Sequence, residues 1–213
     1  MGTLAGGRRT VNAGWIRVGQ GFDIHRFSDD PTRVLVLGGS VFDGERGLEG
    51  HSDADVISHA CSDALLGAAG LGDIGMHFPD TDQRWKGADS LTLLRHVMSL
   101  VGQQRWSVAN IDCAVVCERP KLAPRRDEMQ ATLTQIVGAP VTIKGNRAER
   151  LGAIGRDEGI ACFATALLVH DDAADARDGT AGDRDHDADD PDDHDADDHA
   201  EAAPAVDARQ ETP

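Results

Sequence analysis

Asp23, His25 and His59 are the residues whose types and spacing best fit a metal site. Asp23 and His25 lie two positions apart in a stretch with strand alternation, so both side chains can point to one face. His59 lies where the sequence becomes helical in its periodicity. One carboxylate and two imidazoles with an open fourth position form a ligand set expected of catalytic zinc. Each signal alone is weak, because a strand-end pair facing solvent and a core histidine would look the same.

Asp55, His59 and Asp63 follow one another at intervals of four residues. This spacing places them on one face of a helix. We expect the two carboxylates to orient the His59 ring by hydrogen bonding to the nitrogen that does not face the metal.

Three further features are compatible with a bound phosphate or sugar. Gly72–Gly75 (Gly-Asp-Ile-Gly) can turn tightly and expose backbone N–H groups, and Asp73 can accept from a sugar hydroxyl. A glycine helix cap would give the same pattern. Lys121 follows an expected strand and is either a phosphate-binding cation or a surface lysine. Arg156 lies among glycines, which suggests a tight turn holding one cation.

Alternating strand and helix patterns must position these residues. Asp53 or Ser52 is expected to cap the first helix and Pro124 to open the last. Residues 70–86 form a long irregular stretch, which is uncommon unless it binds something. The order of elements predicts an α+β fold with a mixed sheet covered by helices on one face. Periodicity predicts strands at 15–27, 34–42 (a hairpin), 106–116, 141–144 and 159–168, and helices at about 53–69, 90–101 and 124–137.

Charge divides the chain into a near-neutral domain and an acidic tail. The 213 residues carry a net charge of −16, and residues 171–213 hold 17 of the 37 acidic residues but 3 of the 21 basic ones. This segment has too few apolar residues to bury a core, so we expect a disordered tail there. The domain is expected at 15–170, after a flexible extension at 1–14. Histidines within the tail could buffer metal ions, but a solubilising role is the simpler interpretation.

Cysteine usage and hydropathy bear on compartment and partners. Cys61, Cys113, Cys117 and Cys162 form no Cys-x-x-Cys pair, which favours reduced thiols over a disulfide framework. No apolar stretch reaches the roughly 18 residues of a membrane span, and no signal-peptide core is evident. The composition is not basic enough for nucleic acid. We expect a cytoplasmic protein with neither membrane nor nucleic-acid partners.

Four segments carry a resemblance to a known family: Gly19–Phe27, Gly50–Asp82, Ala114–Lys121 and Leu151–Ala166. They resemble the 2-C-methyl-D-erythritol 2,4-cyclodiphosphate synthases of the non-mevalonate isoprenoid pathway. The resemblance covers roughly residues 16–170 in order. Its most specific part is the run of Gly-Asp-Ile-Gly, Phe-Pro-Asp-Thr-Asp and Gly-Ala-Asp-Ser.

The resemblance implies a homotrimer with sheets facing the threefold axis and an active site at each subunit interface. The substrate would be 4-diphosphocytidyl-2-C-methyl-D-erythritol 2-phosphate, whose 2-phosphate attacks the β-phosphorus and expels CMP. Asp23, His25 and His59 would bind zinc or another divalent ion. A second ion, magnesium or manganese, would bind the diphosphate near Glu149.

The same resemblance assigns roles to further residues. The catalytic residues would be His51, Arg147 and Glu149. Residues that contact the substrate would be Asp23, His25, His51, Ser52, Asp73, Ile74, Gly75, Phe78, Asp80, Asp82, Cys117, Lys121, Leu122, Ala123, Asn146, Arg147, Ala148, Glu149, Ala153 and Arg156.

The chain departs from the family pattern at several of these positions. Asn146 and Arg147 replace two threonines that bind the α-phosphate, and Arg147 could clamp the leaving group, fill the pocket or fold away from it. Ala153 replaces a phenylalanine and Gln20 a histidine near the trimer axis. Asp157 replaces a glycine and could damp the charge of the neighbouring arginine. These changes leave two alternatives to an active synthase: a trimeric zinc-containing binding or regulatory homologue with weak or no turnover, and a zinc phosphohydrolase.

Overall fold

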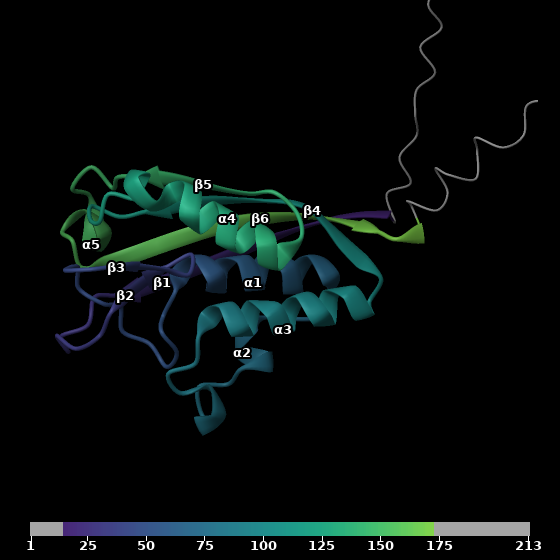
Figure 1. Cartoon of the computed structure of the whole chain (residues 1–213), viewed down its shortest axis with the longest axis horizontal. Coiled ribbons are helices and arrows are strands. Elements are labelled where there is room, and N and C mark those ends of the chain that lie inside the picture. Colours follow the sequence, from purple (N-terminus) through teal and green to yellow (C-terminus); the bar gives the residue numbers. More distant parts are fainter. Residues whose placement is uncertain (1–14, 173–213) are drawn as a thin grey trace, which may run out of the picture. The chain divides into compact units, whose positions relative to one another are not determined.

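The alternating segments of the sequence form one mixed sheet (Figure 1). In it, β6 is antiparallel to both β1 and β4, whereas β4 and β5 are parallel. The predicted strands are confirmed, with ends shifted slightly. The sheet has the order β1-β6-β4-β5, with β1 at Ile16–Arg26, β4 at Trp106–Val116, β5 at Val141–Asn146 and β6 at Gly159–His170.

This structure is a computed structural model, and it describes residues 15–172. The extension expected at 1–14 and the acidic tail, apart from its first two residues, lie outside that range. Within it, no helix combines the length and apolar character needed to cross a membrane.

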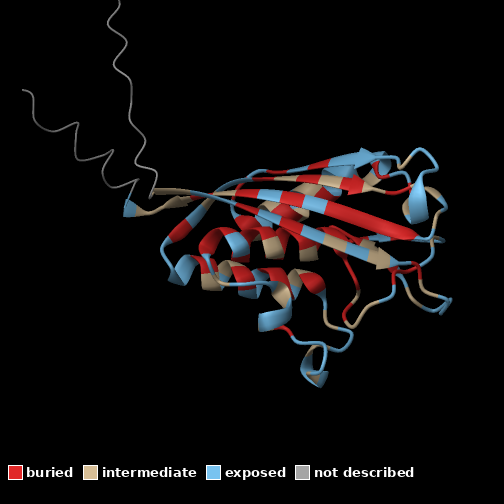
Figure 2. Ribbon diagram, turned by 180° about the vertical axis from the view of Figure 1, so that it is seen from behind, coloured by how far each residue is buried: buried red, intermediate tan, exposed pale blue. Residues whose placement is uncertain are grey.

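Helices cover one face of the sheet, as predicted. α1 (Val56–Ala69) packs on β1 and β6, α4 (Arg126–Val137) packs on β5, and α3 (Ser90–Gln103) packs against α1 and α4. Buried and exposed residues alternate along the strands (Figure 2). The face without helices exposes large apolar side chains, namely Val18, Phe22, Ile24 and Phe163.

The predicted hairpin forms from β2 (Leu35–Leu37) and β3 (Ser40–Phe42). Its turn residues Gly38 and Gly39 both have positive φ angles, 55° and 75°, as a two-residue type I′ turn requires. Their amides donate to the two carboxylate oxygens of Asp55, both at 2.8 Å. Asp55 is also the N-cap of α1. The predicted cap at Ser52 or Asp53 is therefore wrong, and the same buried carboxylate fastens the hairpin to the helix.

Other element boundaries also differ from expectation. The irregular stretch at 70–86 contains α2 (Ile74–His77) and η2 (Gln83–Trp85). The helix expected to open at Pro124 begins at Arg126, because Pro124 lies in a preceding 3₁₀ turn, η3 (Ala123–Arg125). A short helix that the sequence did not predict, α5, spans Gly152–Gly155.

Glycine allows α1 to lie directly on β1. A Cβ atom added at Gly21 would be 2.0 Å from the Ala60 carbonyl oxygen and 2.6 Å from the Ala64 nitrogen. A Cβ atom added at Gly19 would meet the next turn of the helix, 2.0 Å from the Ala64 carbonyl oxygen. These contacts involve backbone atoms, which cannot rotate aside. The close approach brings the first turns of α1 beside the part of β1 that carries Asp23.

We predict that Gly21→Ala destabilises the domain by at least about 3 kcal/mol, because a methyl group there must push the helix off the strand. The free energy of unfolding in urea, followed by circular dichroism, measures the effect. Gly67→Ala is the matched control, since Gly67 lies in the same helix with no atom within 4 Å of an added Cβ. The free energy of unfolding of the control variant should rise by about 0.5–1 kcal/mol, because alanine favours a helix more than glycine does. Equal stability of the Gly21 variant and the parent would contradict the packing described.

Candidate active site

Asp23, His25 and His59 come together between β1 and α1. His25 Nε2 lies 3.0 Å and His59 Nδ1 lies 2.9 Å from the same oxygen, Asp23 Oδ2. The two imidazole nitrogens are 3.4 Å apart, and the three ligand atoms lie within 4.8 Å of one another. Ligands of tetrahedral zinc at 2.0–2.1 Å are about 3.3 Å apart. The three side chains thus converge as expected and form a group that could hold a metal ion.

Hydrogen bonds fix which nitrogen of each ring faces this point. His25 Nδ1 lies 2.6 Å from the Glu49 carbonyl oxygen, which only accepts, so Nδ1 carries the proton and Nε2 offers its lone pair. The Ser90 hydroxyl donates to Asp53, so its oxygen is free to accept from His59 Nε2 at 2.9 Å. In the neutral rings the nitrogens that face Asp23 are thus the deprotonated ones, as metal ligation requires, and they are the atoms that take up a proton and donate to Asp23 when a ring is charged.

The expected orienting role of Asp55 and Asp63 is wrong. Asp55 is fully buried and bonded to the β2–β3 turn, and its burial raises its pKa. Asp63 accepts from the Ile74 amide at 2.7 Å. The His59 ring is instead held by hydroxyls, Ser52 Oγ at 3.1 Å and Ser90 Oγ. Helical spacing correctly predicts a shared face but not which neighbours of the helix compete for its carboxylates.

The electrostatics of the cluster favour a bound cation. Burial opposes ionisation of Asp23, but hydrogen bonds from His25 and His59 outweigh it and lower its pKa. Burial acts against a charge on His25 as well, yet the hydrogen bond and attraction to Asp23 raise the His25 pKa. The site thus stabilises positive charge beside an ionised carboxylate, which a divalent ion would supply in place of a proton.

A cavity of about 290 Å³ opens beside the three residues; we call it the metal-side cavity. Two buried polar atoms on its lining residues, His51 Nε2 and Trp85 Nε1, have no hydrogen-bond partner among the described residues. Trp85 is a lining residue that the sequence did not suggest, because nothing in its own segment distinguishes it from a core aromatic residue. The lining consists of His25, His51, Ser52, His59, Ile74, Phe78, Asp80, Trp85 and Leu93.

Two of the predicted substrate contacts in this region, Asp73 and Asp82, are engaged in local structure. The Asp73 carboxylate caps α2 by accepting from the Met76 amide at 3.0 Å. Asp82 forms an ion pair with Arg84 at 2.6 Å. Of the Gly-Asp-Ile-Gly segment, only Ile74 belongs to the described lining of the metal-side cavity, and Asp73 and Gly75 do not.

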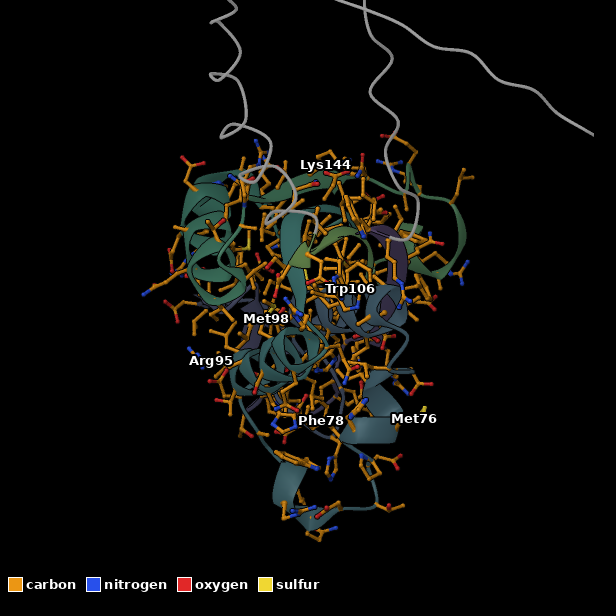
Figure 3. All side chains as sticks on the ribbon, turned by 90° about the vertical axis from the view of Figure 1, so that its right-hand side faces the viewer. Met76, Phe78, Arg95, Met98, Trp106 and Lys144 are labelled. Atoms are coloured by element: carbon orange, nitrogen blue, oxygen red, sulfur yellow. The ribbon has the colours of Figure 1, made fainter. Side chains whose placement is uncertain are left out.

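A second cavity of about 240 Å³, the loop cavity, lies between the segments 117–126 and 145–147. It shares no lining residue with the metal-side cavity. Phe78 lines the metal-side cavity, and Lys144 is the residue before Gly145 of the loop cavity. The two residues lie at opposite sides of the domain (Figure 3). The chain therefore brings the predicted residues together in two groups. The lining of the loop cavity consists of Cys117, Glu118, Pro120, Lys121, Leu122, Ala123, Arg126, Gly145, Asn146 and Arg147.

The remaining predicted residues lie on other segments. Ala153 is in α5, and Glu149 lies in a turn with a φ angle of 51°. Arg156 pairs with Glu158 at 2.6 Å. The residue expected to damp its charge, Asp157, pairs instead with Arg46 at 3.3 Å.

Comparison with known proteins identifies relatives along the whole described domain. Residues 16–169 match the model of the YgbB family. A 2-C-methyl-D-erythritol 2,4-cyclodiphosphate synthase from Pseudomonas aeruginosa is 49% identical over 157 residues, which are 72% of this chain and 99% of the relative. A bifunctional IspD/IspF enzyme from Anaeromyxobacter dehalogenans is 52% identical over 157 residues, and the chain spans only 40% of that enzyme's length.

Solved structures agree with the sequence comparison. A Plasmodium falciparum IspF in complex with CDP is 32% identical, with a TM-score of 0.64, over 73% of this chain and 97% of that one. A 2C-methyl-D-erythritol-2,4-cyclodiphosphate synthase in a CDP-bound form is 36% identical, with a TM-score of 0.65, over 71% and 99%.

We predict that His59→Ala abolishes stoichiometric zinc binding while the domain still folds. Zinc content after metal loading, measured by inductively coupled plasma mass spectrometry, tests this. Loss of a residue that only orients a ligand typically costs about 10–100-fold in affinity, so loss of the ligand itself should cost more than about 100-fold. Ser90→Ala removes only a residue that orients His59, so it should lower the zinc affinity by about 10–100-fold.

His170→Ala is the control, because His170 packs edge-to-face against Trp106 at the far end of β6. It should keep the zinc affinity of the parent. Undiminished zinc in the His59 variant would contradict the ligand assignment.

Proposed function

This chain belongs to the YgbB family, and from that membership we propose that it converts 4-diphosphocytidyl-2-C-methyl-D-erythritol 2-phosphate into 2-C-methyl-D-erythritol 2,4-cyclodiphosphate and CMP. It is thus a lyase-class enzyme. The observation that carries the proposal is the convergence of Asp23, His25 and His59, with the two histidines lining a cavity. Phosphoryl transfer depends on charge neutralisation and in-line positioning rather than on a covalent nucleophile, and a metal ion held by these three residues would supply the neutralisation.

In the proposed reaction an oxygen of the 2-phosphate attacks the β-phosphorus, and the bond from that phosphorus to the bridging oxygen breaks. CMP leaves with the electron pair. When bound, zinc at Asp23, His25 and His59 supplies Lewis-acid polarisation of the β-phosphate, and magnesium or manganese near Glu149 supplies further neutralisation.

The chain's own residues bind and orient the substrate in this scheme. His51, whose Nε2 has no partner among the described residues, and Ser52 would hold the methylerythritol phosphate. Phe78, Trp85 and Leu93 line the same cavity. Their apolar surfaces would exclude water, so attack by the substrate's own 2-phosphate is favoured over attack by water. Asn146 and Arg147 in the loop cavity would donate to the α-phosphate of the departing CMP.

We further propose that the enzyme works as a homotrimer whose sheets face the threefold axis. The two cavities lie apart within one chain, so a neighbouring subunit would have to bring its loop cavity to the metal-side cavity. The exposed sheet face supports this arrangement. Phe22 and Phe163 on this face are 46% and 43% exposed, and their rings are tilted against each other with centroids 4.8 Å apart. They form an apolar surface suited to burial between subunits. The buried free thiols and the highly charged substrate favour the cytoplasm.

A second candidate is a zinc-containing homologue that binds the nucleotide with little turnover. The observation in its favour is that Glu118 already accepts from two N–H groups of Arg147, which leaves three of the five donors for a developing charge.

One assay separates these functions. Purified full-length chain, loaded with zinc and supplied with magnesium, is incubated with the cytidine diphosphate substrate, and products are followed by phosphorus NMR. We expect the cyclic diphosphate and CMP to appear in equal amounts, with loss of both after chelation of the metals. CMP without a cyclic product would indicate hydrolysis, and substrate binding without any product would indicate the second candidate.

We also predict that the domain at 15–170 carries the whole activity. Described contacts continue to Asp171, which accepts from Ser107 at 2.7 Å, and Asp172, which pairs with Arg105 at 2.7 Å. A chain ending after Asp172 should therefore keep the kcat and KM of the full chain within about twofold, since it retains every residue assigned to the site. A drop in kcat, or a change in assembly on size-exclusion chromatography, would assign the tail a role.

A further inference from the structure

Glu118 bridges the two segments that enclose the loop cavity. Its side chain is only 9% exposed, and its Oε2 accepts from Arg147 Nε at 3.0 Å and Nη2 at 2.6 Å. Its other oxygen, Oε1, accepts from the Arg150 amide at 3.2 Å. One carboxylate thus holds both ends of the turn at 147–150 from the opposite wall of the cavity.

The turn that Glu118 holds has a strained backbone. Glu149 and Arg150 have φ angles of 51° and 63°, and consecutive residues other than glycine are uncommon in this left-handed region. Such conformations persist where surrounding contacts enforce them. Here Glu118 contacts residues on both sides of Glu149, and the Leu151 amide closes the turn by donating to the Ala148 carbonyl at 2.9 Å.

The ion pair leaves Arg147 able to bind a further anion. A guanidinium has five N–H donors, and Glu118 takes two of them. The other three remain on a side chain that is 65% exposed and lines the loop cavity. Because the Glu118 carboxylate offsets the charge of Arg147, the pair offers oriented donors with little net positive charge.

We propose that Glu118 is a positioning residue for the phosphoryl transfer. Through Arg147 and the Arg150 amide it fixes the 147–150 turn, so that the free N–H edge of Arg147 and the carboxylate of Glu149 face the substrate's diphosphate together. The inference rests on the proposed function and deepens it: the replacement of threonine by Arg147 is accommodated by its pairing with Glu118.

Glu118→Gln tests this, because glutamine keeps one acceptor and the side-chain volume but loses the charge and the second acceptor. We expect kcat to fall about tenfold, since the turn and Glu149 lose their fixed position. The Kd for CDP with magnesium, measured by calorimetry, should change less than about threefold, because Arg147 remains and is less neutralised. A residue important only for folding would not separate kcat from CDP affinity in this way.

A double-variant cycle tests whether the two residues act as a unit. Arg147→Ala should lower kcat by a similar factor, and the combined variant should lose far less than the product of the two single losses. Glu128→Gln is the matched control. Glu128 forms an equally short ion pair, 2.6 Å to Arg125, outside the lining of the loop cavity, and its loss should leave kcat and Kd unchanged.

The outcomes distinguish this inference from the proposed function. A parent chain that forms the cyclic product, with a Glu118→Gln variant of unchanged kcat, overturns only the positioning role. Parallel loss of kcat, CDP binding and thermal stability in that variant also overturns it, in favour of a structural role. A parent that neither binds CDP nor forms product overturns the proposed function, and the inference with it.

Discussion

A single carboxylate oxygen joins β1 to α1 at the centre of the site. His25 Nε2 and His59 Nδ1 both lie within 3.0 Å of Asp23 Oδ2. Removing a carboxylate from water is costly unless positive charge or hydrogen bonds replace the lost solvation. The two ring nitrogens meet this requirement when they carry a proton or hold a cation. Their orientation toward Asp23 depends on hydrogen bonds that the rings donate to the Glu49 carbonyl and the Ser90 hydroxyl oxygen. The chemistry of the site therefore depends on residues from four separate segments of the chain.

The shared face of Asp23 and His25 could be predicted from local periodicity, whereas the meeting of His59 with them, 36 positions away, was expected from the family resemblance. Alternation places Asp23 and His25 on one face of a strand, and helical periodicity places His59 on a helix. The partners of the rings could not be predicted in this way. Ser90, which accepts from the His59 ring, is 31 positions away in the sequence. Asp55, which the helical spacing predicted as a partner of the ring, instead accepts from two amides of a β-turn. Such choices are decided by tertiary packing, which a single sequence does not encode as a pattern.

The same distinction applies to the loop cavity. The family resemblance identified Arg147 as a departure from the usual threonine, and sequence alone left open whether it assists or obstructs. The answer offered here depends on Glu118, 29 positions away, and on the left-handed backbone at Glu149 and Arg150. Neither feature has a signal in the sequence, since residues other than glycine rarely adopt such φ angles. The sequence identified the relevant segment, and the geometry adds the contacts from which a positioning role for Glu118 is proposed.

β1 links the proposed assembly to the proposed chemistry, because its two faces perform different tasks. Phe22 and Ile24 project from the exposed face of the sheet, whereas Asp23 and His25 project toward α1. The register with β6, in which Asp23 pairs with Cys162, fixes this division. A slip of one residue would exchange the two sets, burying phenylalanine beside the histidines and exposing the carboxylate. Gly19 and Gly21 resist such a slip, since only glycine allows α1 to approach so closely. Strand register therefore determines both where a neighbouring subunit can pack and where a metal can bind.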